Sequence, residues 1–141
     1  MSRIYWDTML FIYFLEGHTQ FGPRVQQIHQ EMNRRGDTLC TSVFTVGEIL
    51  IGPQKRKAFE KLKDTKDYFE SDEIELIPFK MSTAEVYGSI RAGNSILPAD
   101  AIHLASAAEA QSDLFLTNDK KLQRLSIPGI KFIAGLDGAI F

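Results

Sequence analysis

The sequence predicts an α/β fold in which helices cover both faces of a mostly parallel central sheet of about five strands, giving three α/β/α layers. Three observations lead to this prediction. Short apolar segments suited to strands alternate with segments suited to helices along the 141 residues. Hydrophobic residues make up 44% of the chain, which is enough for a buried core. The single cysteine, Cys40, excludes an internal disulfide and a cysteine-based zinc cluster.

The first three elements follow from apolar content and helix signals. Residues 4–6 form a short strand that ends at Asp7. Residues 9–15 are apolar almost all round, which predicts a short helix buried on every side. Pro23 opens a helix that runs to about Arg35. Its apolar stripe consists of Val25, Ile28 and Met32.

The next elements form a strand and two helices. Residues 38–42 suit a strand, in which Cys40 is a small buried hydrophobe. Residues 43–51 follow as a helix, which the Gly52-Pro53 pair is expected to break. Residues 54–70 then form a separate charged helix. Its inward side chains are Phe59, Leu62 and Phe69.

The second half continues the alternation. A β-branched segment at 74–79 suits a strand, and residues 83–92 suit a helix that stops at Gly93. Residues 98–111 form the clearest helix, because Pro98 stands at its start and alanine and leucine dominate its interior.

The predicted elements of the C-terminal part are short. Residues 113–117 suit a strand, residues 118–125 a short helix, and residues 130–133 a last strand after the Pro128-Gly129 turn. Residues 135–141 predict no element.

Charge and hydropathy limit the classes of function. Sixteen basic and 18 acidic residues give a net charge of −2, which is unusual for a protein that binds nucleic acid through a broad basic face. The longest apolar run, residues 9–15, is shorter than the roughly 18 residues of a membrane helix, and it starts too close to the first residue for a signal peptide with a basic flank. We therefore expect one domain, residues 1–141, in the cytoplasm and without a membrane partner.

Four carboxylates stand near the predicted turns: Asp7, Glu48, Asp100 and Asp119. Each has an ordinary alternative. Thr45 and Glu48 have the spacing of a capping box, Asp100 suits the first turn of a helix, and Asp7 and Asn118 or Asp119 suit N-caps.

Taken together, the four carboxylates favour a metal site. The carboxyl ends of parallel strands share one edge of a sheet, so the turns of Asp7, Asp100 and Asp119 should come together, and Glu48 joins them if its helix tilts over that edge. Four ionised carboxylates in one pocket repel one another, and a divalent cation removes this penalty. Mg²⁺ or Mn²⁺ prefers such hard oxygen ligands and suits phosphodiester hydrolysis.

Four short segments carry these carboxylates, in order, along nearly the whole chain. They are Ile4-Tyr5-Trp6-Asp7-Thr8, Thr45-Val46-Gly47-Glu48-Ile49-Leu50, Pro98-Ala99-Asp100-Ala101-Ile102-His103-Leu104-Ala105 and Leu116-Thr117-Asn118-Asp119. The ordered set resembles the PIN-domain ribonucleases, and among them the VapC-type toxins of bacterial toxin–antitoxin pairs. It departs from the family before the third carboxylate, where Leu97-Pro98 replaces a frequent glycine-rich segment.

The resemblance implies a PIN-like fold and a Mg²⁺- or Mn²⁺-dependent endoribonuclease, the toxin of a type II toxin–antitoxin module. It implies that Asp7, Glu48, Asp100 and Asp119 form the catalytic metal site, with hydroxyl groups from Thr8 and Thr117. Asn118 stands beside Asp119, and we expect Asp119 to face the ion because a carboxylate binds Mg²⁺ better than an amide does. The implied partners are RNA, a small cognate antitoxin and a second copy of the chain.

Two alternatives belong to other classes. A metal-dependent phosphatase of the aspartyl-phosphate kind requires a second aspartate two residues after the nucleophile, and Met9 stands there. A non-catalytic RNA-binding or scaffold protein could keep the same fold, although all four acidic positions are filled.

Other residues have both ordinary and functional interpretations. The densest basic cluster suits a solvated helix face or a surface that contacts RNA phosphates; it consists of Lys55, Arg56, Lys57, Lys61, Lys63 and Lys66. Arg91, Lys120 and Lys121 are better placed by chain position to flank the pocket. His103 lies three residues after Asp100, a spacing that suits one shared helix face. A packed residue that supports a neighbouring side chain is favoured for His103 over a catalytic group or metal ligand. Core packing or subunit contact is favoured over base stacking for the aromatic residues Tyr5, Trp6, Phe11, Tyr13 and Phe14.

Overall fold

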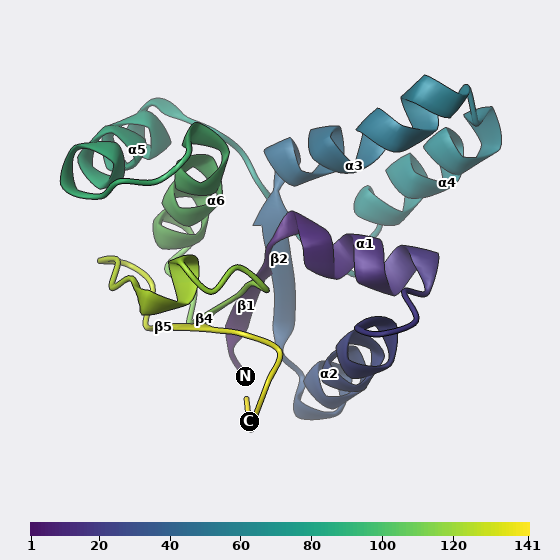
Figure 1. Ribbon diagram of the computed structural model, residues 1–141, viewed down its shortest axis with the longest axis horizontal. Coiled ribbons are helices and arrows are strands. Elements are labelled where there is room, and N and C mark those ends of the chain that lie inside the picture. Colours follow the sequence, from purple (N-terminus) through teal and green to yellow (C-terminus); the bar gives the residue numbers. More distant parts are fainter.

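The computed structural model describes all 141 residues and contains one sheet of five parallel strands in the order β3-β2-β1-β4-β5 (Figure 1). The strands are β1 (Arg3–Trp6), β2 (Thr38–Ser42), β3 (Glu75–Ile77), β4 (Leu114–Leu116) and β5 (Phe132–Ala134). The helices are α1 (Thr8–Glu16), α2 (Gly22–Arg35), α3 (Val43–Arg56), α4 (Phe59–Phe69), α5 (Met81–Gly93), α6 (Pro98–Glu109) and the 3₁₀ helix η1 (Leu122–Arg124).

Helices cover both faces of this sheet, which confirms the predicted three-layer α/β/α class. Alternate residues of β1 point to opposite faces. Ile4 and Trp6 belong to a core built with α1 and α2, whereas Tyr5 belongs to a core built with α6. Figure 1 shows α5 and α6 on one side of the strands and α1 and α2 on the other.

The order of the strands reverses at β1, and this reversal determines where a ligand can bind. The chain places β2 and β3 on one side of β1, and β4 and β5 on the other. In open parallel sheets the carboxyl edge at such a reversal is the usual ligand site. Asp7 directly follows β1, and its backbone amide donates to the carbonyl of Leu116 at the end of β4, with an N···O distance of 3.0 Å.

The expected helix break at Gly52-Pro53 is wrong. Helix α3 continues through Pro53 to Arg56 and ends at Lys57, which has a left-handed conformation with φ of 54°. Proline removes one helix hydrogen bond, but its fixed φ is compatible with a helix, and here its side chain is buried. The helix predicted for 54–70 therefore begins only at Phe59.

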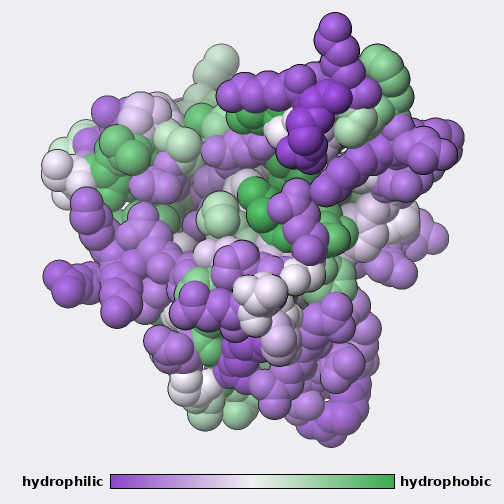
Figure 2. Space-filling view, turned by 45° about the vertical axis from the view of Figure 1, so that its right-hand side comes forward, coloured by the Kyte–Doolittle hydropathy of each residue, from purple (hydrophilic) through white to green (hydrophobic).

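This shift changes which side chains point inward. Phe69 is 2% exposed and packs edge-on against Phe11, but Phe59 is 73% exposed, contrary to the prediction. We call α3 and α4 together the α3–α4 arm; its tip projects away from the sheet (Figure 1). The face turned forward in Figure 2 carries hydrophobic patches among hydrophilic side chains.

Two further predictions are corrected. Helix α1 is not buried on every side, because Met9 and Leu15 are exposed. Residues 118–125 do not form a helix but a turn followed by η1, because side-chain hydrogen bonds of Thr117 and Asp119 compete with helical ones. The last strand lies at Phe132–Ala134, two residues later than the predicted start.

No helix has the length and apolar character that crossing a membrane requires.

The register of α4 can be tested by replacing its two phenylalanines. We expect Phe69→Ala to lower the free energy of unfolding by about 3–5 kcal/mol, because it leaves a cavity beside Phe11. Phe59→Ala removes the same group from an exposed position and should change it by about 0.5 kcal/mol or less. Urea denaturation followed by circular dichroism measures both. Equal effects of the two replacements would contradict the assigned register.

Candidate active site

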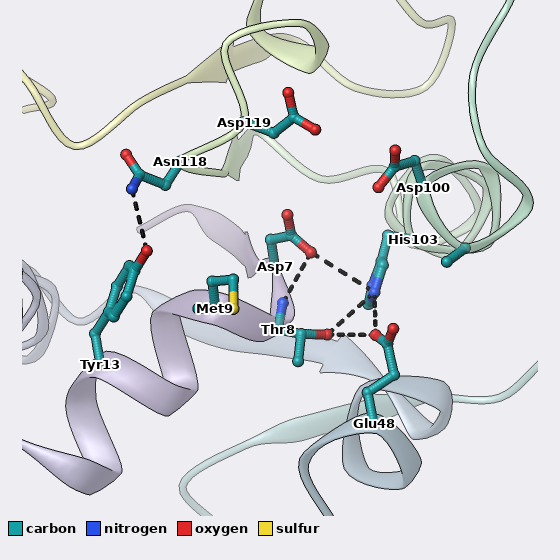
Figure 3. Close-up of a pocket in the computed structure, with 10 residues that line it drawn as sticks. Asp7, Thr8, Met9, Tyr13, Glu48, Asp100, His103, Asn118 and Asp119 are labelled. Atoms are coloured by element: carbon teal, nitrogen blue, oxygen red, sulfur yellow. Dashed lines mark hydrogen bonds and ion pairs between the residues drawn. The ribbon is translucent and has the colours of Figure 1, made fainter. Parts of the chain in front are cut away.

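A cavity of about 350 Å³ opens at the carboxyl edge of the sheet and brings the four predicted carboxylates together (Figure 3). Ten residues line it: Asp7, Thr8, Met9, Tyr13, Glu48, Ala99, Asp100, His103, Asn118 and Asp119. They come from segments that are far apart in the sequence. The expected meeting of these segments at one edge of the sheet is therefore observed.

Asp7 is the N-cap of α1, as one of the sequence interpretations predicted, and it also lines the cavity. As the N-cap of α1, its Oδ1 accepts from the amide of Thr8 at 2.8 Å. Its Oδ2 accepts from the hydroxyl of Thr117 at 2.8 Å. The same hydroxyl accepts from the amide of Asp119 at 3.0 Å, so Thr117 connects the ends of β1 and β4 beneath the cavity.

Glu48 does not form the capping box that its spacing from Thr45 suggests. The N-cap of α3 is Ser42, whose hydroxyl accepts from the amide of Thr45. Glu48 instead extends into the cavity, where its Oε1 accepts from the hydroxyl of Thr8 at 2.6 Å and from Nε2 of His103 at 2.7 Å.

The pKa of Glu48 is lowered, although burial acts to raise it. The hydrogen bonds from His103 and Thr8 favour the ionised carboxylate and outweigh the burial. Glu48 is therefore held in its charged form.

His103 is a packed residue that supports a neighbouring carboxylate, as the sequence favoured. Its side chain is 3% exposed, and its Nδ1 lies 2.7 Å from the hydroxyl of Tyr5. Because an ionised carboxylate only accepts hydrogen bonds, Nε2 of His103 carries the hydrogen directed at Glu48. In the neutral imidazole, Nδ1 then accepts from Tyr5.

Tyr5 supports this arrangement from the core. Its hydroxyl accepts from the amide of Ser42 at 3.3 Å, and its ring stacks on Phe115. Burial raises the pKa of Tyr5, so the hydroxyl keeps its proton. The sequence marked Tyr5 only as an aromatic residue for core packing, subunit contact or base stacking, and no local signal linked it to Glu48.

Asp100 and Asp119 occupy the other side of the cavity (Figure 3). Asp100 lies in the first turn of α6, and its pKa is raised, first by burial and then by the charges of Asp7 and Asp119. Asn118 turns away from this group, because its amide nitrogen donates to the hydroxyl of Tyr13 at 3.1 Å. Asp119, rather than Asn118, thus faces Asp100.

The donor chemistry of the cavity fits a hard divalent cation. Its lining holds four carboxylates and no lysine or arginine. The pKa of Asp100 is raised by burial and then by the charges of Asp7 and Asp119, a repulsion that a cation would relieve. No group of three or more Asp, Glu, His or Cys side chains is arranged to hold an ion as the structure stands. Mg²⁺ needs only one or two protein carboxylates, because it usually keeps several water ligands.

The basic residues lie elsewhere, with one exception. The cluster around Lys55 lies on the α3–α4 arm, where Lys61 pairs with Glu16 and Lys63 with Asp67. Arg91 bonds to the hydroxyl of Tyr87. Lys121 alone among the basic residues lines a cavity adjoining the carboxylates.

The aromatic residues are mainly core residues, as predicted. Tyr5, Trp6 and Phe11 are fully buried, and Phe14 packs against the same core as Trp6. Tyr13 is 7% exposed and lines the cavity. Cys40 is buried, which raises the pKa of its thiol to about 12.

The sequence matches the PIN domain family over residues 4–128, and the chain therefore belongs to this family. A comparison with curated proteins finds no match.

Solved structures share the fold at low sequence identity. A chain of VapBC2 from Rickettsia felis, bound to a promoter DNA fragment, aligns with a TM-score of 0.74 and 20% identity over 94% of this chain and 98% of that one. A chain of DNA-bound VapBC from Salmonella typhimurium aligns with a TM-score of 0.71 and 23% identity over 97% of this chain and 100% of that one. A chain of a toxin–antitoxin complex from Klebsiella pneumoniae aligns with a TM-score of 0.68 and 20% identity over 90% of this chain and 94% of that one.

The hydrogen bond from Thr8 to Glu48 yields a prediction about pH. We expect Thr8→Val to raise the pKa of Glu48, because one of the two donors that favour its ionised form is lost. Thr117→Val removes a hydroxyl bonded to Asp7 instead and should leave that pKa unchanged. Carbon-13 NMR titration of the Glu48 carboxyl, with a metal chelator present, measures both.

The lowered pKa of Glu48 also predicts how the free energy of unfolding depends on pH. Because the pKa of Glu48 is lower in the folded protein than in the unfolded chain, its ionisation stabilises the fold above the unfolded value. This contribution is lost as the pH falls through the folded value, and the loss should be smaller in Thr8→Val. A Glu48 pKa that does not respond to Thr8→Val would contradict the assigned contact.

Proposed function

We propose that this protein is a Mg²⁺- or Mn²⁺-dependent endoribonuclease and the toxin of a type II toxin–antitoxin pair. The observation that carries the proposal is one cavity in a PIN domain, lined by Asp7, Glu48, Asp100 and Asp119 and by no lysine or arginine. The fold shared with chains of VapBC complexes supports the same class.

In this proposal the carboxylates divide into two groups. Asp7, Asp100 and Asp119 hold the cation, one or two of them directly and the rest through its water ligands, and the bonds of Asp7 to Thr8 and Thr117 keep its oxygens in place. The cation, when bound, neutralises charge on the phosphodiester and lowers the pKa of a bound water. Glu48 accepts a hydrogen bond from the attacking water, or also binds the ion.

The surroundings of Glu48 suit this role. Thr8 and His103 both donate to Oε1, which leaves Oε2 free to accept from water. His103 is in turn held by Tyr5, so the position of the carboxylate is set by buried groups rather than by solvent.

The partner part of the proposal rests on the neighbours and on the surface. The matched structures from Rickettsia felis and Salmonella typhimurium are VapBC assemblies, and the one from Klebsiella pneumoniae is a toxin–antitoxin complex. In this chain the apolar residues of α1 are largely used by its own core, but large apolar side chains on the α3–α4 arm are exposed; they are Val43, Phe44, Ile51 and Phe59. We propose that a small antitoxin covers such a surface, that the toxin forms a homodimer, and that it acts in the cytoplasm.

Metal-dependent cleavage of RNA tests the enzymatic part. Purified protein should cleave a structured RNA with Mn²⁺ or Mg²⁺, and a chelator should abolish the cleavage. Asp7→Asn should lower the rate by about 100-fold or more, because a ligand of the ion is lost. The matched control is Asp64→Asn on the exposed side of α4, which should cleave like the wild type.

A second measurement does not depend on activity. Mn²⁺ should raise the Tm of the wild type and of Asp64→Asn but not that of Asp7→Asn, because ligand binding stabilises only a protein that has the site. Cleavage that persists both with chelator and in Asp7→Asn would rule out the proposed mechanism.

Co-expression with any short reading frame that adjoins this gene tests the partner. We expect a stable complex of the two proteins that suppresses cleavage of RNA. Ile51→Glu in the α3–α4 arm should weaken the complex, because it places a charge on an exposed apolar surface, whereas Phe79→Glu, at a similarly exposed apolar residue outside the arm, should not. A monomer that no small protein binds would contradict this part of the proposal.

A further inference from the structure

A second cavity, of about 260 Å³, adjoins the acidic one and shares Asp100 and Asp119 with it. We call it the side cleft. Its other lining residues are Ser95, Ile96, Leu97, Lys121 and Leu122. Asp100 and Asp119 therefore separate two neighbouring spaces, and a group held at these carboxylates has one space on either side.

The chemistry of the side cleft differs from that of the acidic cavity. Leu122, which is 1% exposed, forms a buried apolar part of its lining, whereas Leu97 is 70% exposed. A large apolar side chain thus faces solvent beside two carboxylates. Lys121 is the only basic residue in the lining of either space.

The backbone fixes Lys121 close to the carboxylates. Its amide donates to Oδ1 of Asp119 at 2.9 Å, within the turn that follows β4. Leu97 directly precedes the first residue of α6, the helix that carries Asp100. Both residues of the side cleft are therefore positioned by the same elements that position the shared carboxylates.

We propose that the side cleft binds one nucleotide of the RNA next to the scissile phosphodiester, with its base against Leu97 and a phosphate on Lys121. This inference rests on the proposed function. A nucleotide combines an apolar base face with an anion, and the side cleft combines an apolar wall with a cation.

An acidic peptide of a protein partner could use the same two features, but the geometry favours RNA. A strand whose scissile phosphodiester lies in the acidic cavity can continue into the side cleft, because Asp100 and Asp119 line both spaces. The apolar wall also limits how selective the subsite is, because apolar contacts discriminate bases weakly. We therefore expect a modest preference for the base at one position beside the cut.

Cleavage kinetics test the subsite with paired variants. The substrates are short fluorescent oligoribonucleotides that differ only in the bases flanking one cleavage site. Lys121→Gln should raise KM by about tenfold with little change in kcat, and reduce the slope of log affinity against log salt by about one. Lys120→Gln is the matched control, because Lys120 is exposed, neighbours Lys121 and lines neither space.

Leu97→Ala tests the apolar wall. Because Leu97 is largely exposed, its replacement should leave the fold intact and flatten the preference at one flanking base while cleavage of all substrates continues. An equal fall in the cleavage rate of every substrate, with the base preference unchanged, would overturn the inference. So would a Lys121→Gln variant that behaves like Lys120→Gln.

A binding measurement separates this inference from the proposed function. In methyl NMR spectra, the four common nucleoside monophosphates, with Mg²⁺ present, should shift the Ile96, Leu97 and Leu122 resonances, whereas inorganic phosphate should not shift them. If the wild type cleaves RNA but these methyl groups do not respond, the subsite is wrong and the nuclease stands. If the wild type cleaves no RNA, the proposed function fails, and the titration alone decides whether the side cleft binds nucleotides. Methyl groups that respond to the antitoxin and to no nucleotide would assign the side cleft to protein binding and overturn the inference.

Discussion

The pairing of β1 with β4 is the constraint on which the site depends. These strands are distant in the sequence, yet the amide of Asp7 donates to the carbonyl of Leu116, and the hydroxyl of Thr117 donates to the carboxylate of Asp7. A parallel pair brings equivalent ends together, so the turns after both strands open on one side of the sheet. Without this pairing, nothing would bring Asp7 and Asp119 to the same cavity.

Repulsion between the carboxylates is the second feature of the site, and the protein's own groups stabilise the charge of Glu48 but not that of Asp100. Glu48 is stabilised in its ionised form by two donors, and its pKa is lowered. Asp100 has burial and two neighbouring charges against it, and its pKa is raised. The carboxylate of Glu48 on α3 is therefore stabilised by hydrogen bonds within the protein. The carboxylate of Asp100 on α6 is not, and a cation would supply the missing counter-charge.

Much of the fold could be predicted from the sequence, and the errors have physical causes. The alternation of strands and helices and the parallel sheet were predicted correctly, because buried strands and amphipathic helices carry clear periodic patterns. Pro53 was expected to end a helix, but a buried proline with a helical φ is accommodated within α3. The turn at Asp119 was expected to be helical, but local side-chain bonds decided its conformation.

The sequence by itself determined that the site is acidic. Four carboxylates at predicted turns, and no cluster of cysteine and histidine, already indicated a group of oxygen donors at one edge of a parallel sheet. Only the tertiary structure decided how each carboxylate is held. Tyr5, His103 and Glu48 lie on β1, α6 and α3, and the bonds between them join residues separated by 98 and 55 positions. No local pattern encodes such contacts, because they arise only when the packed elements bring the side chains within hydrogen-bonding distance.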